Sequence, residues 1–333
     1  MLSHPQRILF LLMGCFTLIL PVKSKPYIID NEDFLYSFSL QGNRQYSGGY
    51  KAVARYEDGF IAAGTDGRID RITISGTITK SEIFPGEKFN CVITHDKIII
   101  AAGDRGTLLS SNETGIFHKV DSNTGENINS LSLFRGIIIG VTDHGEIISG
   151  DGKGSFKKTR LPLKGNIVSV SARESDCFGV TDEGEIIRTA DGIKWDIIDF
   201  NKVYSGYYKT SYFTKVLVTD NHIAIAGIDN DGSPVLILST LGNVWTERPL
   251  IYTDDQGHKV VLEDSPNDII YNDSEDLFYM VCNKGKVMQL PACNQCNKVA
   301  VISTEDLEGI TFNDKMMMIV GGNFLIKAVS LKW

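Results

Sequence analysis

The chain has little cysteine, little proline and no excess of positive charge. Its 333 residues include 6 cysteines and 9 prolines, and 33 basic residues stand against 41 acidic ones, for a formal net charge of −8. So few cysteines argue against a small fold framed by disulfides. An acidic chain also lacks the basic surface that the phosphates of nucleic acids require. We therefore expect no nucleic-acid partner.

Long apolar runs are also missing, except near the N-terminus. Residues 8–20 are almost wholly apolar, follow Arg7, and precede Val22-Lys23-Ser24, which stands at the usual spacing of a cleavage site. This run is too short for a membrane span and is typical of a secretory signal. We expect a signal peptide over residues 1–24, no transmembrane segment, and a secreted or periplasmic protein. The sequence Leu12–Cys15 resembles a lipoprotein box, so a lipid-anchored envelope protein is the alternative.

What the sequence has instead is a repeat with glycine at a fixed position. Gly67 and Gly106 are 39 residues apart, the same spacing recurs twice more, and each glycine stands between two apolar runs. A period near 40 residues with strand-forming composition predicts a β-propeller, with one small sheet, or blade, per repeat. The matching turn glycines are Gly67, Gly106, Gly145, Gly184, Gly232, Gly285 and Gly322.

A single repeat unit shows how each blade is predicted to form. Residues 128–134, 136–141, 146–149 and 156–161 are predicted to be four short antiparallel strands separated by polar turns. The seventh unit ends after its third strand. We therefore predict an all-β chain in which residues 25–333 form a single seven-bladed β-propeller of four-stranded antiparallel blades. Its ring is closed by an N-terminal strand, expected at residues 34–40.

A second position of the repeat carries a large side chain after a small polar turn. The clearest examples are Ser111–Phe117, Thr189–Trp195 and Ser239–Trp245. These turns resemble degenerate Asp-boxes of the bacterial-neuraminidase-repeat (BNR) propellers. Within that superfamily the chain is most similar to the photosystem II assembly factor-like propellers, and more distantly to sialidases. The resemblance spans nearly the whole mature chain and implies a fold, because the residues of an Asp-box tie a turn and pack a blade.

Two connections between blades are longer than the others. The glycine spacing rises to 48 residues between Gly184 and Gly232 and to 53 between Gly232 and Gly285. The extra residues fall at 201–212 and 251–265. Connections between blades leave the ring on the same side as the turn glycines, so we expect two long loops side by side on one rim. Loops carried by a rigid scaffold are common sites of function.

The composition of these two loops suits recognition. The first is rich in tyrosine, whose flat amphipathic ring stacks on a sugar or holds a protein segment. The second combines carboxylates with a histidine, and Ca²⁺ is the one ion that such oxygens suggest. Its spacing matches no defined metal loop, so we predict no metal site and no cofactor. The predicted ligand-binding residues are Tyr204, Tyr207, Tyr208, Tyr212, Tyr252, Asp254, Asp255 and His258.

The cysteines of the mature chain divide into one close pair and three separate residues. Cys293 and Cys296 fall on the turn of blade six that corresponds to an Asp-box, where a local disulfide would tie the turn in an oxidising compartment. Cys91, Cys177 and Cys282 fall on strands of three different blades. We predict that these three are buried free thiols.

The resemblance to sialidases implies one enzymatic alternative. Those enzymes carry three arginines around a carboxylate, a tyrosine nucleophile paired with glutamate, and an Arg-Ile-Pro motif that this chain lacks. We therefore predict no catalytic residues and a monomeric, secreted, non-catalytic propeller that binds a protein or a glycan. A sialidase-like or other propeller glycoside hydrolase is the alternative. An assembly factor for an envelope complex is a third possibility that follows from the resemblance alone.

Overall fold

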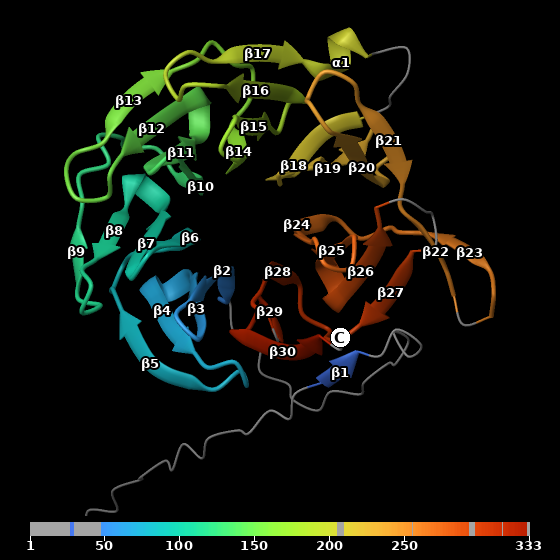
Figure 1. Ribbon diagram of the computed structural model, residues 1–333, viewed down its shortest axis with the longest axis horizontal. Coiled ribbons are helices and arrows are strands. Elements are labelled where there is room, and N and C mark those ends of the chain that lie inside the picture. Colours follow the sequence, from blue (N-terminus) through green and yellow to red (C-terminus); the bar gives the residue numbers. More distant parts are fainter. Residues whose placement is uncertain are drawn as a thin grey trace, which may run out of the picture.

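Runs of β-branched residues that alternate with tight turns fold into four-stranded sheets. Seven of these sheets surround a central axis as the blades of a propeller (Figure 1). The prediction of an all-β, seven-bladed propeller is confirmed. The structure, a computed structural model, describes residues 27–29, 48–204, 210–254, 256–292, 297–314 and 316–331.

In blades 1 to 6 the strands follow chain order from the axis outward (Figure 1). Blade 1 comprises β2 (Tyr50–Tyr56), β3 (Gly59–Gly64), β4 (Arg68–Ile72) and β5 (Ile78–Ile83). Blade 2 comprises β6 (Phe89–His95), β7 (Ile98–Gly103), β8 (Leu108–Ser111) and β9 (Phe117–Lys119). Blade 3 comprises β10 (Ile128–Phe134), β11 (Ile137–Thr142), β12 (Glu146–Gly150) and β13 (Lys157–Arg160). Blade 4 comprises β14 (Ile167–Ala172), β15 (Cys177–Thr181), β16 (Glu185–Thr189) and β17 (Asp196–Asp199). Blade 5 comprises β18 (Thr210–Val218), β19 (Ile223–Asp229), β20 (Pro234–Ser239) and β21 (Thr246–Pro249). Blade 6 comprises β24 (Pro266–Asn272), β25 (Leu277–Cys282), β26 (Lys286–Pro291) and β27 (Lys298–Val301).

The ring closes in blade 7, which joins both ends of the chain. Its strands are β28 (Leu307–Phe312), β29 (Met316–Gly321), β30 (Leu325–Leu331) and the N-terminal β1 (Tyr27–Ile29). An N-terminal strand closes the ring, as predicted, but the described strand is β1, and it pairs with β30 in parallel. The segment 34–40, expected in this place, lies outside the described residues.

The apolar core lies between the blades. The buried residues form seven hydrophobic clusters, and each cluster joins two neighbouring blades. The second strands show this most clearly, because β7 and β11 are buried along nearly their whole length. A strand packed on both faces is expected to be uniformly apolar. Each blade is therefore stabilised by its two neighbours.

The turn glycines connect the second and third strands of a blade. In η2 (Asp104–Gly106), Arg105 and Gly106 have φ values of 54° and 70°. A Cβ atom at Gly106 would lie 2.0 Å from the Thr124 carbonyl oxygen, so no other residue fits. The same short element recurs as η1 (Thr65–Gly67), η3 (Asp143–Gly145) and η4 (Asn283–Gly285).

Blade 7 departs from this turn. Gly322, predicted to be its turn glycine, comes first in the turn and accepts a hydrogen bond from the Leu325 amide at 3.1 Å. The glycine position is occupied by Phe324, whose φ of 55° is unusual for a bulky residue. Its ring lies edge-on to Tyr50 of blade 1, with 5.2 Å between the centroids, and under the Arg68 guanidinium. Packing against blade 1 therefore accompanies this strained backbone at the seam where the ring closes.

An asparagine fastens several blades to the next one. Asn129 occupies a bulge in β10, and its amide donates to Asp143 Oδ1 at 2.9 Å and to the Ile167 carbonyl of blade 4 at 3.0 Å. Asn90 and Asn267 make the corresponding pair of bonds in blades 2 and 6. A single side chain thus ties the turn of its own blade to the first strand of the next.

Replacing Asn129 with alanine tests this tie. Asn129→Ala should lower the free energy of unfolding by about 1–3 kcal/mol, because Asp143 Oδ1 and the Ile167 carbonyl each lose a donor. Urea denaturation measures the change. The exposed Asn221 is the matched control, and Asn221→Ala should change stability by less than about 0.5 kcal/mol. Equal effects of the two substitutions would contradict the role given to Asn129.

Candidate functional site

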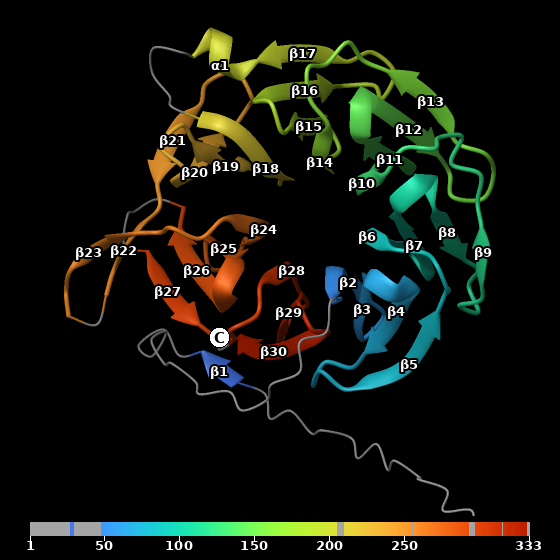
Figure 2. The same cartoon turned by 180° about the vertical axis from the view of Figure 1, so that it is seen from behind.

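The candidate site is the rim of blades 4 to 6 on the side of the turn glycines. The two long connections cross consecutive seams there, 4–5 and 5–6 (Figures 1 and 2). The first contains the short helix α1 (Phe200–Val203) and leads into β18. The second contains a hairpin, β22 (Ile251–Thr253) and β23 (Lys259–Val261), where the sequence analysis expected a loop. We call residues 251–261 the arm.

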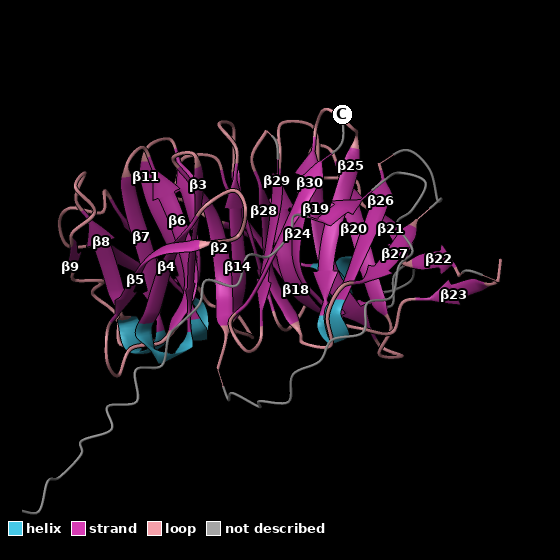
Figure 3. Cartoon of the chain, turned by 90° about the horizontal axis from the view of Figure 1, so that it is seen from below, coloured by secondary structure: helices cyan, strands magenta, loops and turns pink. Residues whose placement is uncertain are grey.

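The arm projects outward from the ring, as Figure 3 shows in a side view. Its strands pair Ile251 with Val261 and Thr253 with Lys259. The hairpin turn is tied by Asp254, whose Oδ1 accepts the amides of Gln256 at 2.9 Å and His258 at 2.7 Å. The Asp254 carboxylate therefore stabilises the arm's own turn.

The arm has an apolar root. The residues on either side of it, Leu250 and Leu262, are fully buried in the cluster between blades 5 and 6. The Leu262 amide donates to the Leu250 carbonyl at 2.8 Å, which brings the two ends of the arm together. Tyr252 is half-buried and packs against the same cluster. The hairpin is therefore held where it leaves the ring.

A polar contact holds the arm to blade 6. The buried Arg248 guanidinium donates to Asn297 Oδ1 at 2.7 Å and to the Pro291 carbonyl. The Asn297 amide in turn donates to the Ile251 carbonyl at 2.7 Å, and Asn297 forms an isolated parallel bridge with Tyr252. The β22 edge of the arm is thus joined to the outer part of blade 6.

An ion pair fastens the end of the same connection. Asp264 is buried beside Lys286, which contacts its Oδ2, and Lys284 Nζ lies 3.0 Å from its Oδ1. Burial alone would raise the pKa of Asp264, but the hydrogen bonds and charges of the two lysines outweigh it and hold the pKa below its ordinary value. The carboxylate is therefore stabilised in its charged form.

This ion pair occupies a recurrent position. In other blades the residue after the turn glycine also holds the preceding connection: Glu146 accepts from Thr124 Oγ1 at 2.7 Å, and Glu185 accepts from the Lys164 amide at 2.8 Å. In blade 6 the pair is Lys286 with Asp264. The long connection is thus anchored in the same way as the short ones.

The first connection is also built on a packed base. Phe200 of α1 is fully buried and lies near Trp245, with 6.2 Å between the ring centroids. Tyr204 packs on Phe200 at 4.7 Å and donates to the Asn243 carbonyl at 3.4 Å. Val203, 61% exposed, and Val244, 71% exposed, lie on the surface beside this contact. Tyr204 is therefore part of the support of this corner.

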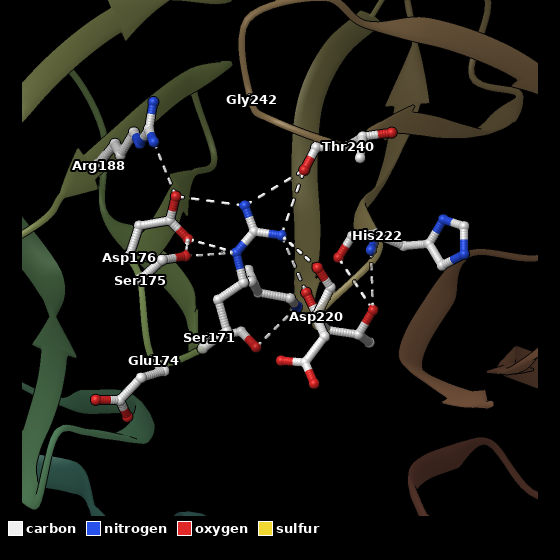
Figure 4. A network of polar contacts seen from close by, with 12 residues as sticks. Ser171, Glu174, Ser175, Asp176, Arg188, Asp220, His222, Thr240 and Gly242 are labelled. Carbon is white, nitrogen blue, oxygen red and sulfur yellow. Dashed lines mark hydrogen bonds and ion pairs between the residues drawn. The ribbon is translucent and has the colours of Figure 1, made fainter.

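A network of charged side chains around the buried Asp176 holds the seam under this corner (Figure 4). The Arg173 guanidinium donates to Asp176 Oδ1 at 2.7 Å and to the Thr219 carbonyl of blade 5 at 3.2 Å. Arg188 donates to Asp176 Oδ2 at 2.8 Å. Burial would raise the pKa of Asp176, but the two arginines hold it below its ordinary value. The network joins blades 4 and 5 on the side opposite the turn glycines.

The other predicted residues are placed as follows. Tyr212 is 39% exposed at the start of β18, and the exposed His258 lies with its Nδ1 3.4 Å from Asp254 Oδ2. Among the described residues, no group of three or more histidine, cysteine or acidic side chains could hold a metal ion. The remaining predicted residues lie outside the described part of the chain: Tyr207, Tyr208, Asp255, Cys293 and Cys296.

The three separate cysteines are buried free thiols, as predicted. Burial raises the pKa of Cys91, Cys177 and Cys282 to about 12. A thiol with so high a pKa stays protonated at neutral pH and is a poor nucleophile. These residues therefore act as small apolar groups of the core.

The residues that build the root of the arm were not among those predicted from the sequence. Arg248, Asn297, Asp264 and Lys286 lie outside any recognised motif. A signal did exist for Lys286, because it directly follows a turn glycine, as Glu146 and Glu185 do. Nothing comparable marks Arg248, whose partner Asn297 is 49 residues away.

Comparisons with known proteins support the fold alone. No family model matches the sequence, and no curated protein is similar to it. Among solved structures, the crystal structure of the computationally designed Ika8 protein is similar, with a TM-score of 0.63, 10% identity, and coverage of 86% of this chain and 98% of that one. In all, 1369 chains of solved structures match, so the architecture is too common to indicate a function. No described helix is long and apolar enough to span a membrane.

Changing Asp264 to asparagine tests the ionic anchor. At pH 7, Asp264→Asn should lower the free energy of unfolding by about 1–3 kcal/mol, because two lysines lose their charged partner. The folded pKa lies below the unfolded value, so this stability is complete above about pH 4 and is lost as the pH falls through the folded pKa. Denaturation curves of wild type and variant should therefore converge in acid.

The control for this experiment is Asp58, which is exposed on the hairpin between β2 and β3. Asp58→Asn should change stability by less than about 0.5 kcal/mol at every pH. A difference between wild type and Asp264→Asn that stays constant from neutral to acid pH would contradict the proposed ion pair.

Proposed function

We propose that this chain is a secreted, non-catalytic propeller that binds a protein or glycan partner through the turn-side rim of blades 4 to 6. The observation that carries the proposal is the arm, which stands outside the ring on an anchored root. Its position in a long connection of an otherwise regular scaffold is typical of a recognition element. The propeller fold by itself suggests a binding or scaffold role.

The free edge of the arm suits a protein partner. The pairs Leu250–Leu262 and Asp254–His258 are hydrogen-bonded. In an antiparallel ladder hydrogen-bonded pairs alternate with pairs that are not, and Lys259 and Val261 belong to the second kind. Their amide and carbonyl groups therefore point away from β22. Among the described strands, β23 pairs with β22 alone. Val261 is 48% exposed on this edge. An open edge of this kind accepts an extended segment of another protein by strand addition.

The corner at α1 suits either partner. Val203 and Val244 are exposed at this corner and Tyr212 is half-exposed, and the sequence that connects α1 to β18 contains Tyr207 and Tyr208. Aromatic rings on a packed base supply contact area for a sugar face or an apolar side chain. The two elements belong to adjacent seams, and we propose that they form one surface.

A glycan array on residues 25–333, with and without Ca²⁺, is the first test. A specific signal that Tyr207→Ala with Tyr208→Ala abolishes, at an unchanged Tm, would assign a glycan. A blank array from folded protein would assign a protein partner. In that case Val261→Pro should abolish binding because it removes an outward amide, whereas Val261→Ala, which keeps that amide, should retain it. A partner whose binding survives all these substitutions would contradict the proposal.

A further inference from the structure

The sequence contains two acceptor motifs for asparagine-linked glycosylation, which play no part in the binding surface. They are Asn112-Glu113-Thr114 and Asn272-Asp273-Ser274. An asparagine followed two positions later by serine or threonine can receive an oligosaccharide in a secreted protein if it lies on the surface. The fold places these two asparagines in opposite environments.

Asn112 is presented for modification. It is exposed in the turn between β8 and β9, and its Oδ1 accepts the Thr114 hydroxyl at 2.7 Å and the amides of Thr114 and Ile116 at 3.1 and 2.9 Å. All of these bonds use the oxygen of the amide. No described residue accepts a hydrogen bond from Nδ2, so the nitrogen that would carry a sugar is left to the solvent side of the turn.

The other side of this turn is closed by packing. The Gly115 carbonyl accepts from Arg71 Nη2 of blade 1 at 3.4 Å, and a Cβ atom at Gly115 would lie 1.8 Å from that nitrogen. Gly115 is buried, whereas Asn112, Glu113 and Thr114 are all exposed. A substituent on Asn112 would therefore extend away from the ring without disturbing the contact between blades 1 and 2.

Asn272 has the same motif but lies in a closed environment. Its side chain is buried at the end of β24, and its Nδ2 donates to Glu275 Oε2 at 2.9 Å. The Ser274 hydroxyl donates a hydrogen bond to Asn272 Oδ1 at 2.7 Å, so both the nitrogen and the oxygen of the side-chain amide are hydrogen-bonded. An oligosaccharide on this nitrogen would displace Glu275 and could not fit within the folded blade.

We propose that Asn112 carries an N-linked oligosaccharide and that Asn272 does not. In the reaction, Asn112 Nδ2 forms a bond to C1 of the first sugar of a lipid-diphosphate-linked oligosaccharide. The bond from C1 to the diphosphate breaks, the lipid diphosphate leaves, and the nitrogen loses one proton. The inference rests on the proposed secretion, through a compartment that holds the transferase and this donor.

The position of Asn112 agrees with the proposed binding surface. The turn between β8 and β9 lies on blade 2, and the arm lies between blades 5 and 6, on the other side of the ring (Figure 1). A glycan on Asn112 would leave the arm and the α1 corner uncovered. Modification and partner binding are therefore compatible in one molecule.

The test expresses the full chain in a eukaryotic secretory host, once with its own residues 1–24 and once with an established secretory leader in their place. Peptide-N-glycosidase treatment of cell lysate and medium, with mass spectrometry of the peptides, reads the occupied sites. We expect one oligosaccharide, on Asn112. Thr114→Ala should remove it, and Thr114→Ser, which keeps both the motif and a hydroxyl, should retain it. Asn272→Gln should not change the number of oligosaccharides.

The outcomes separate this inference from the proposed function. If Asn112 is unmodified in the chain that carries the established leader, the inference is overturned. An oligosaccharide on Asn272 of the folded, secreted protein would also overturn it. Failure of the chain's own leader alone would instead contradict the proposed secretion, while occupancy of Asn112 behind the established leader would still support its assignment as an acceptor.

Discussion

The structure depends on apolar packing between neighbouring blades. A four-stranded blade is too thin to have a core of its own, and each of the seven hydrophobic clusters joins two blades. Every blade therefore needs two neighbours, and only a closed ring leaves no blade with an uncovered face. Closure explains why blade 7 tolerates Phe324 in a strained conformation, because its ring packs on blade 1 across the last seam.

Seam packing also allows two connections to be longer without loss of the ring. In the regular blades, a buried polar residue after the turn glycine holds the preceding connection, and Lys286 does the same for the connection that carries the arm. Arg248 and Asn297 add a second attachment. The additional residues are thus free to form a projecting hairpin while the strands on either side of them keep their places.

The sequence was sufficient to predict the fold because its repeat has a steric cause. At Gly67, Gly106, Gly184 and Gly285 a Cβ atom would lie within 2.2 Å of an atom of the next connection, so the same residue recurs at these turns. The prediction failed where no such constraint acts. Gly322 was assigned to a position that Phe324 occupies, and residues 251–261 were expected to be a loop because two three-residue strands leave a weak pattern.

The candidate site was less predictable from the sequence than the fold. Tyrosine content pointed to the α1 corner, but it did not show that Tyr204 supports this corner by packing on Phe200. The contact between Arg248 and Asn297 joins residues far apart in the chain, and no local pattern reports such a pair. Long-range polar contacts of this kind depend on how the blades assemble.

Removing the arm tests the account most directly. Leu250 and Leu262 already form a hydrogen-bonded pair, so an Asn-Gly turn can replace residues 251–261 between them. The shortened chain should unfold cooperatively, with a free energy of unfolding no more than about 3 kcal/mol below that of the wild type. It loses the packing of Tyr252, the hydrogen bond from Asn297 to the Ile251 carbonyl, and the short bridge between Tyr252 and Asn297. It should also lose binding to the partner of the intact chain. Failure to fold, or binding that survives without the arm, would contradict the division between a self-supporting ring and an arm for recognition.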